Sequence, residues 1–148
     1  MASAPRIKPM TLDEMAASLP NGLHDAELAT VAIDFTRGEV RLTLDIWIGD
    51  DEETEAYRQA EVTLCGLVYW VSEAPDARYL YGDTDAVRID VGPLTQLDAA
   101  KRAKLPPAPA DAFSNYIFVA DWNAFIYVAA RSAALQWCGE RTVRTYGE

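Results

Sequence analysis

The sequence has few of the residues from which catalytic and metal sites are usually built. It contains one histidine, His24, and two cysteines, Cys65 and Cys138, in 148 residues. One histidine cannot form a two-histidine metal site, and two distant cysteines in apolar surroundings are expected to be buried, reduced thiols. The sequence has no Gly-Xaa-Ser-Xaa-Gly segment and no glycine-rich phosphate loop. We therefore expect no catalytic residues, no metal site and no cofactor.

Positive charge is also scarce. The chain has 13 Lys and Arg against 23 Asp and Glu, which gives a formal net charge of −10 at pH 7, and no basic stripe interrupts the acidic residues. Such a chain repels phosphate backbones, so we do not expect direct nucleic-acid binding. A basic protein partner is compatible with this charge, although acidity by itself also keeps a small protein soluble.

The sequence shows no segment that marks a secreted or membrane protein. Residues 1–6 have no apolar core before a cleavage site, so we expect neither a secretory signal nor a lipid anchor. The most hydrophobic segment, residues 116–137, contains Asp121 and Arg131, which are costly in a bilayer. We therefore predict that this segment is part of a core and that the protein is cytoplasmic.

Apolar and aromatic residues, in contrast, are plentiful. Half of the residues are hydrophobic, and the chain has four Trp and seven Tyr, which excludes a disordered low-complexity protein. The length fits one domain with a substantial core. We expect residues 1–148 to form a single domain, with residues 1–10 as a flexible N-terminal arm.

Local patterns near the N-terminus predict a helix followed by a hairpin. Thr11 with Glu14 three residues later fits a helix N-cap, and the apolar spacing that follows predicts a short helix at about residues 12–18. Apolar residues then fall on odd positions from Ala29 to Phe35 and on even positions from Val40 to Ile48. This alternation predicts two antiparallel strands that bury one face.

Further strand signals continue to the end of the chain. We expect a third strand at residues 57–72 with a bulge or bend at Gly66, short strands at 79–81 and 86–91 around a turn at 82–85, and a hairpin at 114–130. Residues 94–103 suit a helical segment and residues 105–109 an extended connector, while residues 130–137 fit either strand or helix.

These signals define a fold class. We predict an α+β, mainly β protein with about six antiparallel strands in a curved sheet or partly open barrel, and one or two short helices. The absence of βαβ alternation argues against a doubly wound nucleotide-binding fold.

An acidic loop is the first candidate binding surface. Five carboxylates fall within residues 49–55, too crowded to pack inside a sheet. Neither this loop nor the acids of residues 83–90 have the spacing of a calcium-binding EF-hand loop. Two tryptophans could act as aromatic anchors ringed by acid, a composition suited to a basic protein surface. The predicted partner-binding residues are Trp47, Asp50, Asp51, Glu52, Glu53, Glu55 and Trp122.

The His24-Asp25 pair allows a catalytic and a structural interpretation. A carboxylate can orient an imidazole for proton transfer, but neighbours on a strand point to opposite faces and do not normally pair. We expect His24 to find its partner elsewhere in the chain and to hold the start of a strand, with a functional role left open.

Residues 23–28, Leu-His-Asp-Ala-Glu-Leu, together with the alternating hairpin after them and the late aromatic strand pair, resemble small bacterial immunity proteins of polymorphic toxin systems, particularly the Imm50-like group. The resemblance covers roughly residues 20–130 in general pattern, and the proline-rich 105–109 segment and the alanine-rich end depart from it. It implies a non-enzymatic protein that binds and neutralises a cognate toxin, for which a basic toxin is a natural partner of an acidic protein.

Two other interpretations remain open. An aromatic-lined β-barrel could bind a small molecule or act on it; its pocket would consist of His24, Trp70, Tyr116, Phe118 and Tyr127. A homo-oligomer joined through sheet edges is the other alternative.

Overall fold

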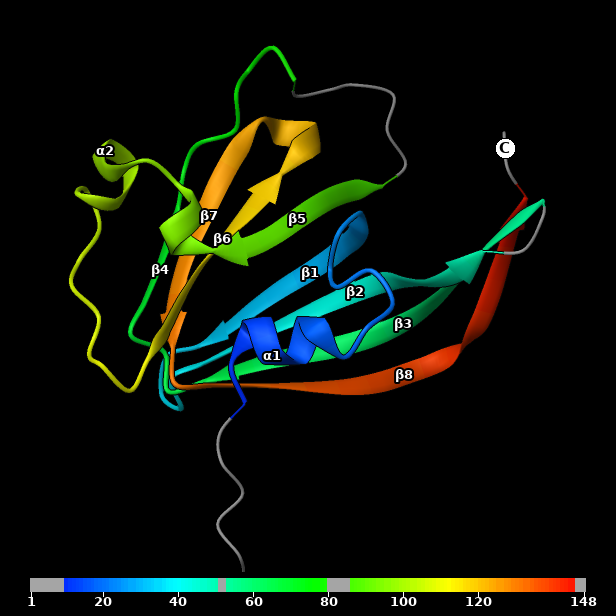
Figure 1. Ribbon diagram of the computed structural model, residues 1–148, viewed down its shortest axis with the longest axis horizontal. Coiled ribbons are helices and arrows are strands. Elements are labelled where there is room, and N and C mark those ends of the chain that lie inside the picture. The colour runs from blue at the N-terminus through cyan, green and yellow to red at the C-terminus, as the bar shows by residue number, and fades with distance from the viewer. Residues whose placement is uncertain (1–9, 51–52, 80–85, 146–148) are drawn as a thin grey trace, which may run out of the picture.

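The computed structural model describes residues 10–50, 53–79 and 86–145, in which eight strands form one antiparallel sheet (Figure 1). The strand order is β4-β7-β6-β5-β1-β2-β3-β8, so β4 and β8 are the edges and the sheet is open. The strands are β1 (Ala26–Asp34), β2 (Glu39–Asp50), β3 (Thr54–Cys65), β4 (Tyr69–Ser72), β5 (Val87–Pro93), β6 (Phe113–Val119), β7 (Ala124–Ala130) and β8 (Ser132–Thr145). The helices are α1 (Leu12–Ala17) and α2 (Ala99–Arg102), with 3-10 turns η1 (Leu94–Gln96) and η2 (Ala120–Trp122).

The predicted fold class is confirmed, with more strands than expected. The predicted third strand is divided into β3 and β4 at Gly66, whose φ of +66° favours glycine, and where a Cβ would lie 2.8 Å from the Cβ of Arg131. The residues left open after 130 belong to β8, a 14-residue strand. The expected helical segment at 94–103 is instead η1 and a separate α2, which begins after the N-cap Asp98.

Two layers of the sheet enclose the main core. Figure 1 shows β4, β7, β6 and β5 in one layer and β1, β2, β3 and β8 in the other, converging where β7 continues into β8. Between β1 and β5 the layers share only three residue pairs, from Ala26↔Ile89 to Leu28↔Val87. Leu42 and Leu44 from one layer pack with Ile117 from the other in a single buried cluster. Burial of each such side chain stabilises the fold by about 1.5–3 kcal/mol.

Helix α1 completes this core. As predicted, Thr11 is its N-cap and accepts a hydrogen bond from the backbone N–H of Glu14 at 3.1 Å. Leu12 and Met15 are fully buried in the interior cluster. The helix is also linked to β8, because the backbone N–H of Ala133 donates to the Met10 carbonyl at 2.8 Å.

The other face of the β4-β7-β6 layer carries a second, aromatic cluster. Alternation along β7 sends Ile126 and Val128 to the interior and Phe125 and Tyr127 to the opposite side. The residues that form or pack against this second cluster are Tyr69, Tyr127, Ala129, Val68, Leu94, Leu97, Leu105, Tyr116 and Phe125. The segment from η1 to residue 105 therefore covers this face of the sheet.

The predicted burial of the first strand is largely wrong, whereas that of the second is confirmed except at Ile48, which is half-buried. Val40 to Ile46 are buried at every even position. On β1, however, Val31 is 38% exposed and Phe35, just beyond the strand, is 87% exposed. Ala29 is also exposed, and only Ile33 is half-buried. The register shifts between Leu28 and Thr30, and β5 accompanies β1 only as far as Leu28. No described strand pairs with the second edge of β1 beyond that point.

The two cysteines are free, but the expected burial of both is wrong. Cys65 is half-buried at the end of β3, and Cys138 is exposed. Cys138 is exposed because it falls on the outer face of the edge strand β8, in alternation with the exposed Gln136 and Glu140. The predicted strand at 79–81 also fails at Tyr79, which is in a turn; residues 80–85 and the proposed arm before residue 10 lie outside the described residues.

Candidate functional site

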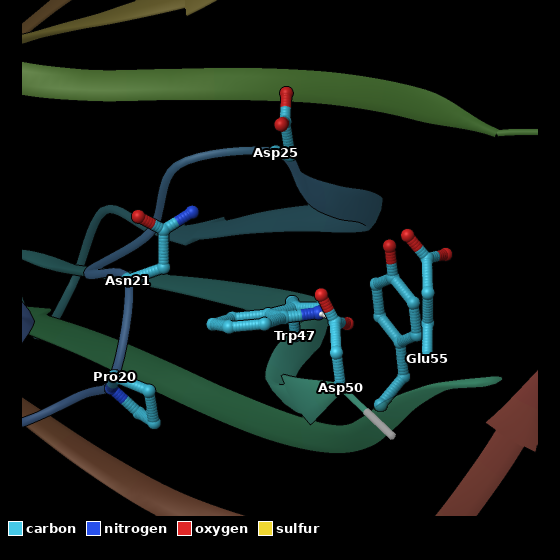
Figure 2. Close-up of a pocket in the computed structure, with 7 residues that line it drawn as sticks. Pro20, Asn21, Asp25, Trp47, Asp50 and Glu55 are labelled. Atoms are coloured by element: carbon cyan, nitrogen blue, oxygen red, sulfur yellow. Dashed lines mark hydrogen bonds between the residues drawn. The ribbon is translucent and has the colours of Figure 1, made fainter. Parts of the chain in front are cut away.

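An acidic and aromatic pocket of about 380 Å³ lies where the loop after α1 faces the ends of β2 and β3 (Figure 2). Figure 2 shows Asp25 across the pocket from Trp47, Asp50 and Glu55. The lining residues are Pro20, Asn21, Asp25, Trp47, Asp50, Glu55 and Tyr57. We call this the acidic pocket.

Strand pairing places four of these side chains together. In the β2–β3 ladder Trp47 is directly opposite Tyr57, and Asp50 is opposite Glu55. The register shifts by one residue between Trp47 and Gly49, whose φ of +151° favours glycine. Such bulges re-aim the side chains beside them. The hairpin thus presents two aromatic rings and two carboxylates as one unit.

Trp47 and Asp50 orient one another. The indole Nε1–H donates a hydrogen bond to Asp50 Oδ1. Asp50 forms no ion pair with any described residue, and neither does Glu55. Two carboxylates therefore face the pocket without an ion-pair partner in the described part of the chain.

Tyr57 is the most buried side chain of the acidic pocket. It is 7% exposed, and its hydroxyl has no hydrogen-bond partner among the described residues. Burial raises the pKa of Tyr57 above its usual value, and the charges of Glu55 and Glu27 add to this effect. The hydroxyl is therefore protonated at neutral pH and can donate as well as accept.

A guanidinium group already lies against the pocket tyrosine. The Arg144 guanidinium carbon is 4.0 Å from the centroid of the Tyr57 ring. Its Nη1 donates to Glu27 Oε2 at 2.7 Å, and its Nη2 is 3.6 Å from Asp45 Oδ2. The hydrogen bond to Glu27 raises the pKa of Arg144 further, against an opposing effect of burial.

His24 lies beside the pocket at the junction of the two layers. Its Nδ1 is 2.7 Å from Asp90 Oδ1 on β5, and its Nε2 is 3.6 Å from Asp25 Oδ2. The hydrogen bond to Asp90 is the main cause that raises the pKa of His24. As expected, the closer partner comes from elsewhere in the chain. His24 and Asp25 are in a turn before β1 rather than on a strand, and Asp25 has a left-handed φ of 58°.

Comparisons with protein-family models, curated proteins and solved structures found no match.

The described residues offer no metal centre and no membrane helix. They contain no group of three or more His, Cys, Asp or Glu side chains that could hold a metal ion. No helix within the described ranges is long and apolar enough to cross a membrane. The chemistry that the acidic pocket supports is recognition of a cationic group, because its polar atoms are mainly carboxylate oxygens between aromatic rings.

The structure brings three of the predicted partner-binding residues together. Trp47, Asp50 and Glu55 line the acidic pocket, while Glu53 is exposed just before β3 and is not among the lining residues. Asp51 and Glu52 lie outside the described residues. Trp122 does not join them: it ends η2 and packs against the interior cluster.

The residues of the alternative aromatic pocket do not converge. Trp70 packs against the interior cluster, whereas Tyr116 and Tyr127 belong to the aromatic cluster on the opposite side of the sheet. Phe125 lies 4.8 Å from Phe118 and 5.9 Å from Tyr127 between ring centroids, so these rings pack on one another. His24 lies in the turn before β1. Trp70 does line an apolar cavity of about 540 Å³, with Ile33, Phe35, Gly38, Leu67, Val68 and Tyr69.

Four pocket residues were not predicted as site residues. Asn21 was recognised only as part of a turn, and Tyr57 only as the start of a strand. Asp25 was expected to bind the amides of a turn, and Pro20 only to end the first helix. The alternation of β2, which places Trp47 opposite the first residues of the next strand, is a signal that could have found Tyr57.

Proposed function

We propose that this chain is a non-enzymatic binding protein that captures a basic protein partner through the acidic pocket. The observation that carries this proposal is the convergence of Asp25, Asp50 and Glu55, from three separate segments, on one cavity. Asp50 and Glu55 have no ion-pair partner among the described residues, and Asp25 has only His24 at 3.6 Å. An incoming cationic side chain would supply the missing charge.

The overall charge supports a basic partner. A net charge of −10 attracts a cationic protein over a distance of about one Debye length, roughly 8 Å at physiological salt, and raises its rate of association. The pocket, at about 380 Å³, falls in the range of about 300–1,000 Å³ typical of specific binding cavities. The pocket would fix the orientation of a partner that the wider charge attracts.

The resemblance to immunity proteins suggests what the partner does. We infer that the partner is a basic toxin that acts on nucleic acids, and that the acidic pocket occupies a toxin surface built to hold phosphates. Asp25 belongs to the Leu-His-Asp-Ala element on which the resemblance rests, and it lines the pocket.

Capture from host-cell extract, washed across a salt gradient, tests the proposal. The wild-type protein is compared with the double variant Asp50→Asn/Glu55→Gln and with Glu14→Gln/Glu140→Gln, which changes the same charge at exposed acids outside the pocket. We expect a basic protein that the wild type and the control variant retain, and that the pocket variant loses at a lower salt concentration.

The captured protein is then expressed with and without this chain. Growth that is inhibited by the partner alone, restored by the wild type and not restored by the pocket variant supports toxin neutralisation. A partner retained equally by all three proteins at every salt concentration would contradict a role for the acidic pocket.

A further inference from the structure

We infer that the acidic pocket is specific for the planar guanidinium group of an arginine side chain on the partner, in preference to a lysine ammonium. This inference rests on the proposed function and names the chemical group that the pocket receives. It depends on the pocket walls, on the Tyr57 hydroxyl, which has no hydrogen-bond partner among the described residues, and on the position of Arg144.

The walls of the pocket are flat and aromatic. Trp47 and Tyr57 are cross-strand partners, so an indole and a phenol ring stand side by side at the pocket surface. A guanidinium is planar and weakly hydrated and stacks on aromatic faces, whereas an ammonium is a compact and strongly hydrated charge. Of the aromatic side chains, tryptophan attracts a cation most strongly.

The Tyr57 hydroxyl is a polar group that a ligand in the pocket can reach. The side chain is 93% buried, since 7% of its surface is exposed, yet its hydroxyl has no hydrogen-bond partner in the described part of the chain. The hydroxyl oxygen is not one of the fully enclosed polar atoms that lack a partner among the described residues, so it opens onto the pocket, where water or a ligand reaches it. The hydroxyl belongs to a pocket-lining residue, so an N–H donor bound there could satisfy it.

Arg144 shows that this tyrosine accepts a guanidinium. Its guanidinium lies over the Tyr57 ring while its nitrogens face the carboxylates of Glu27 and Asp45. The pocket also combines an aromatic ring with two carboxylates: the ring is that of Trp47, and the carboxylates are those of Asp50 and Glu55. One end of the β2–β3 hairpin therefore holds a guanidinium from its own chain and offers a matching place for a second.

The carboxylate acceptors of the pocket lie on different sides of it, as the several N–H donors of a guanidinium group require. Asp50 is held through Oδ1 by the Trp47 indole, which leaves Oδ2 oriented and available. Asp25 lies across the pocket from Glu55, so acceptors approach from different sides (Figure 2). A guanidinium has five N–H donors in a fixed plane and can bind carboxylates in bidentate fashion. An ammonium carries three donors on a single nitrogen and has no flat face for the rings.

The test uses two probes of equal charge, N-acetyl-arginine amide and N-acetyl-lysine amide. Binding is followed by NMR through the indole Nε1–H resonance of Trp47, one of four indole resonances, identified by its loss in Trp47→Phe. We expect a saturable shift of this resonance with the arginine amide, at a Kd several-fold lower than with the lysine amide. Asp50→Asn should raise the Kd about tenfold, and Tyr57→Phe about fivefold, because they remove one charged and one neutral hydrogen bond.

The outcomes separate this inference from the proposed function. Equal affinity for both amides, or no saturable shift with either, overturns guanidinium specificity; salt-sensitive capture of a basic partner could still hold in that case. If the pocket variant captures the partner as well as the wild type does, the proposed function is overturned, even if the arginine amide binds. Glu14→Gln keeps the wild-type affinity if the effect belongs to the pocket, and a dispersed NMR spectrum shows that each variant is folded.

Discussion

Two groups of aromatic side chains in this protein have opposite surroundings. On the β4-β7-β6 layer, the Tyr116 hydroxyl donates to Gln96 Oε1 and the Tyr127 hydroxyl to Glu73 Oε2, each at 3.1 Å. In the acidic pocket, the Tyr57 hydroxyl has no partner among the described residues. The first group pairs its tyrosine hydroxyls within the chain, whereas the second leaves the Tyr57 hydroxyl facing a pocket without a partner among the described residues.

The covering segment explains this difference. Leu94, Leu97 and Leu105 pack against the aromatic cluster, and Lys101 lies over Phe125, with its Nζ 4.0 Å from the ring centroid. Over the acidic pocket, Pro20 and Asn21 form one wall, and a cavity remains. Aromatic residues alone therefore do not indicate a site; a cavity beside them, lined by polar atoms without partners among the described residues, makes a better candidate.

The largest expected effect is on stability, from truncation of an aromatic ring. Phe125→Ala should lower the free energy of unfolding by about 3 kcal/mol, because the neighbouring rings lose their common partner. Trp47→Ala should lower it by only about 1 kcal/mol, since the indole is half-buried at the edge of a cavity. Urea unfolding measures both, and equal losses would remove the distinction between the two groups.

Removal of single hydroxyl groups tests the same comparison more finely. Tyr127→Phe should cost about 1 kcal/mol, because Glu73 loses a donor and the phenol loses its bond. Burial raises the pKa of Tyr127 to about 12, and this hydrogen bond to Glu73 is the second cause of the rise. Tyr57→Phe should leave the free energy of unfolding within about 0.5 kcal/mol of the wild type. A loss from Tyr57→Phe as large as that from Tyr127→Phe would mean that the Tyr57 hydroxyl is structural.

Local sequence signals predicted the elements whose packing follows their own pattern. Thr11 and Met15 identified α1, and the even positions from Val40 to Ile46 identified the buried face of β2. The tip of the β6–β7 hairpin was also predicted; there Asn123 has the left-handed φ of 47° that a turn requires.

The features that the sequence did not predict depend on contacts between residues that are far apart in the chain. The exposure of Val31 depends on where β5 stops accompanying β1, which no feature of residues 29–35 reveals. Charge density and alternation identified Asp50, Glu55 and Trp47, but Asp25 joins them only through the path of the loop after α1. Trp122, which was predicted as a second aromatic anchor beside Trp47, packs against the core instead.

Neutralising the pocket acids should have a smaller effect on stability, and in the opposite direction. Asp50→Asn/Glu55→Gln should raise the free energy of unfolding by about 0.5 kcal/mol at low salt, because two like charges on paired residues repel. High salt should abolish the gain by screening. Unfolding measured at two salt concentrations checks this, with Glu14→Gln/Glu140→Gln as the control. A stability loss would show that the two carboxylates support the fold, which contradicts their proposed role as groups that bind a partner.

The smallest expected effect concerns the junction that holds the two layers together beside the pocket. Since the bond to Asp90 raises the pKa of His24 above 6.5, its stabilising contribution is full below pH 6.5 and is lost as the pH rises through the folded-state pKa. The His24 side chain is 52% exposed, so solvent screening limits this contribution to about 0.5 kcal/mol or less. The chain has a single histidine, so one imidazole NMR signal reports the pKa directly. Asp90→Asn should return the pKa toward 6.5 and flatten the dependence of stability on pH. An unchanged pKa in that variant would assign the shift to Asp25 and to the acidic pocket itself.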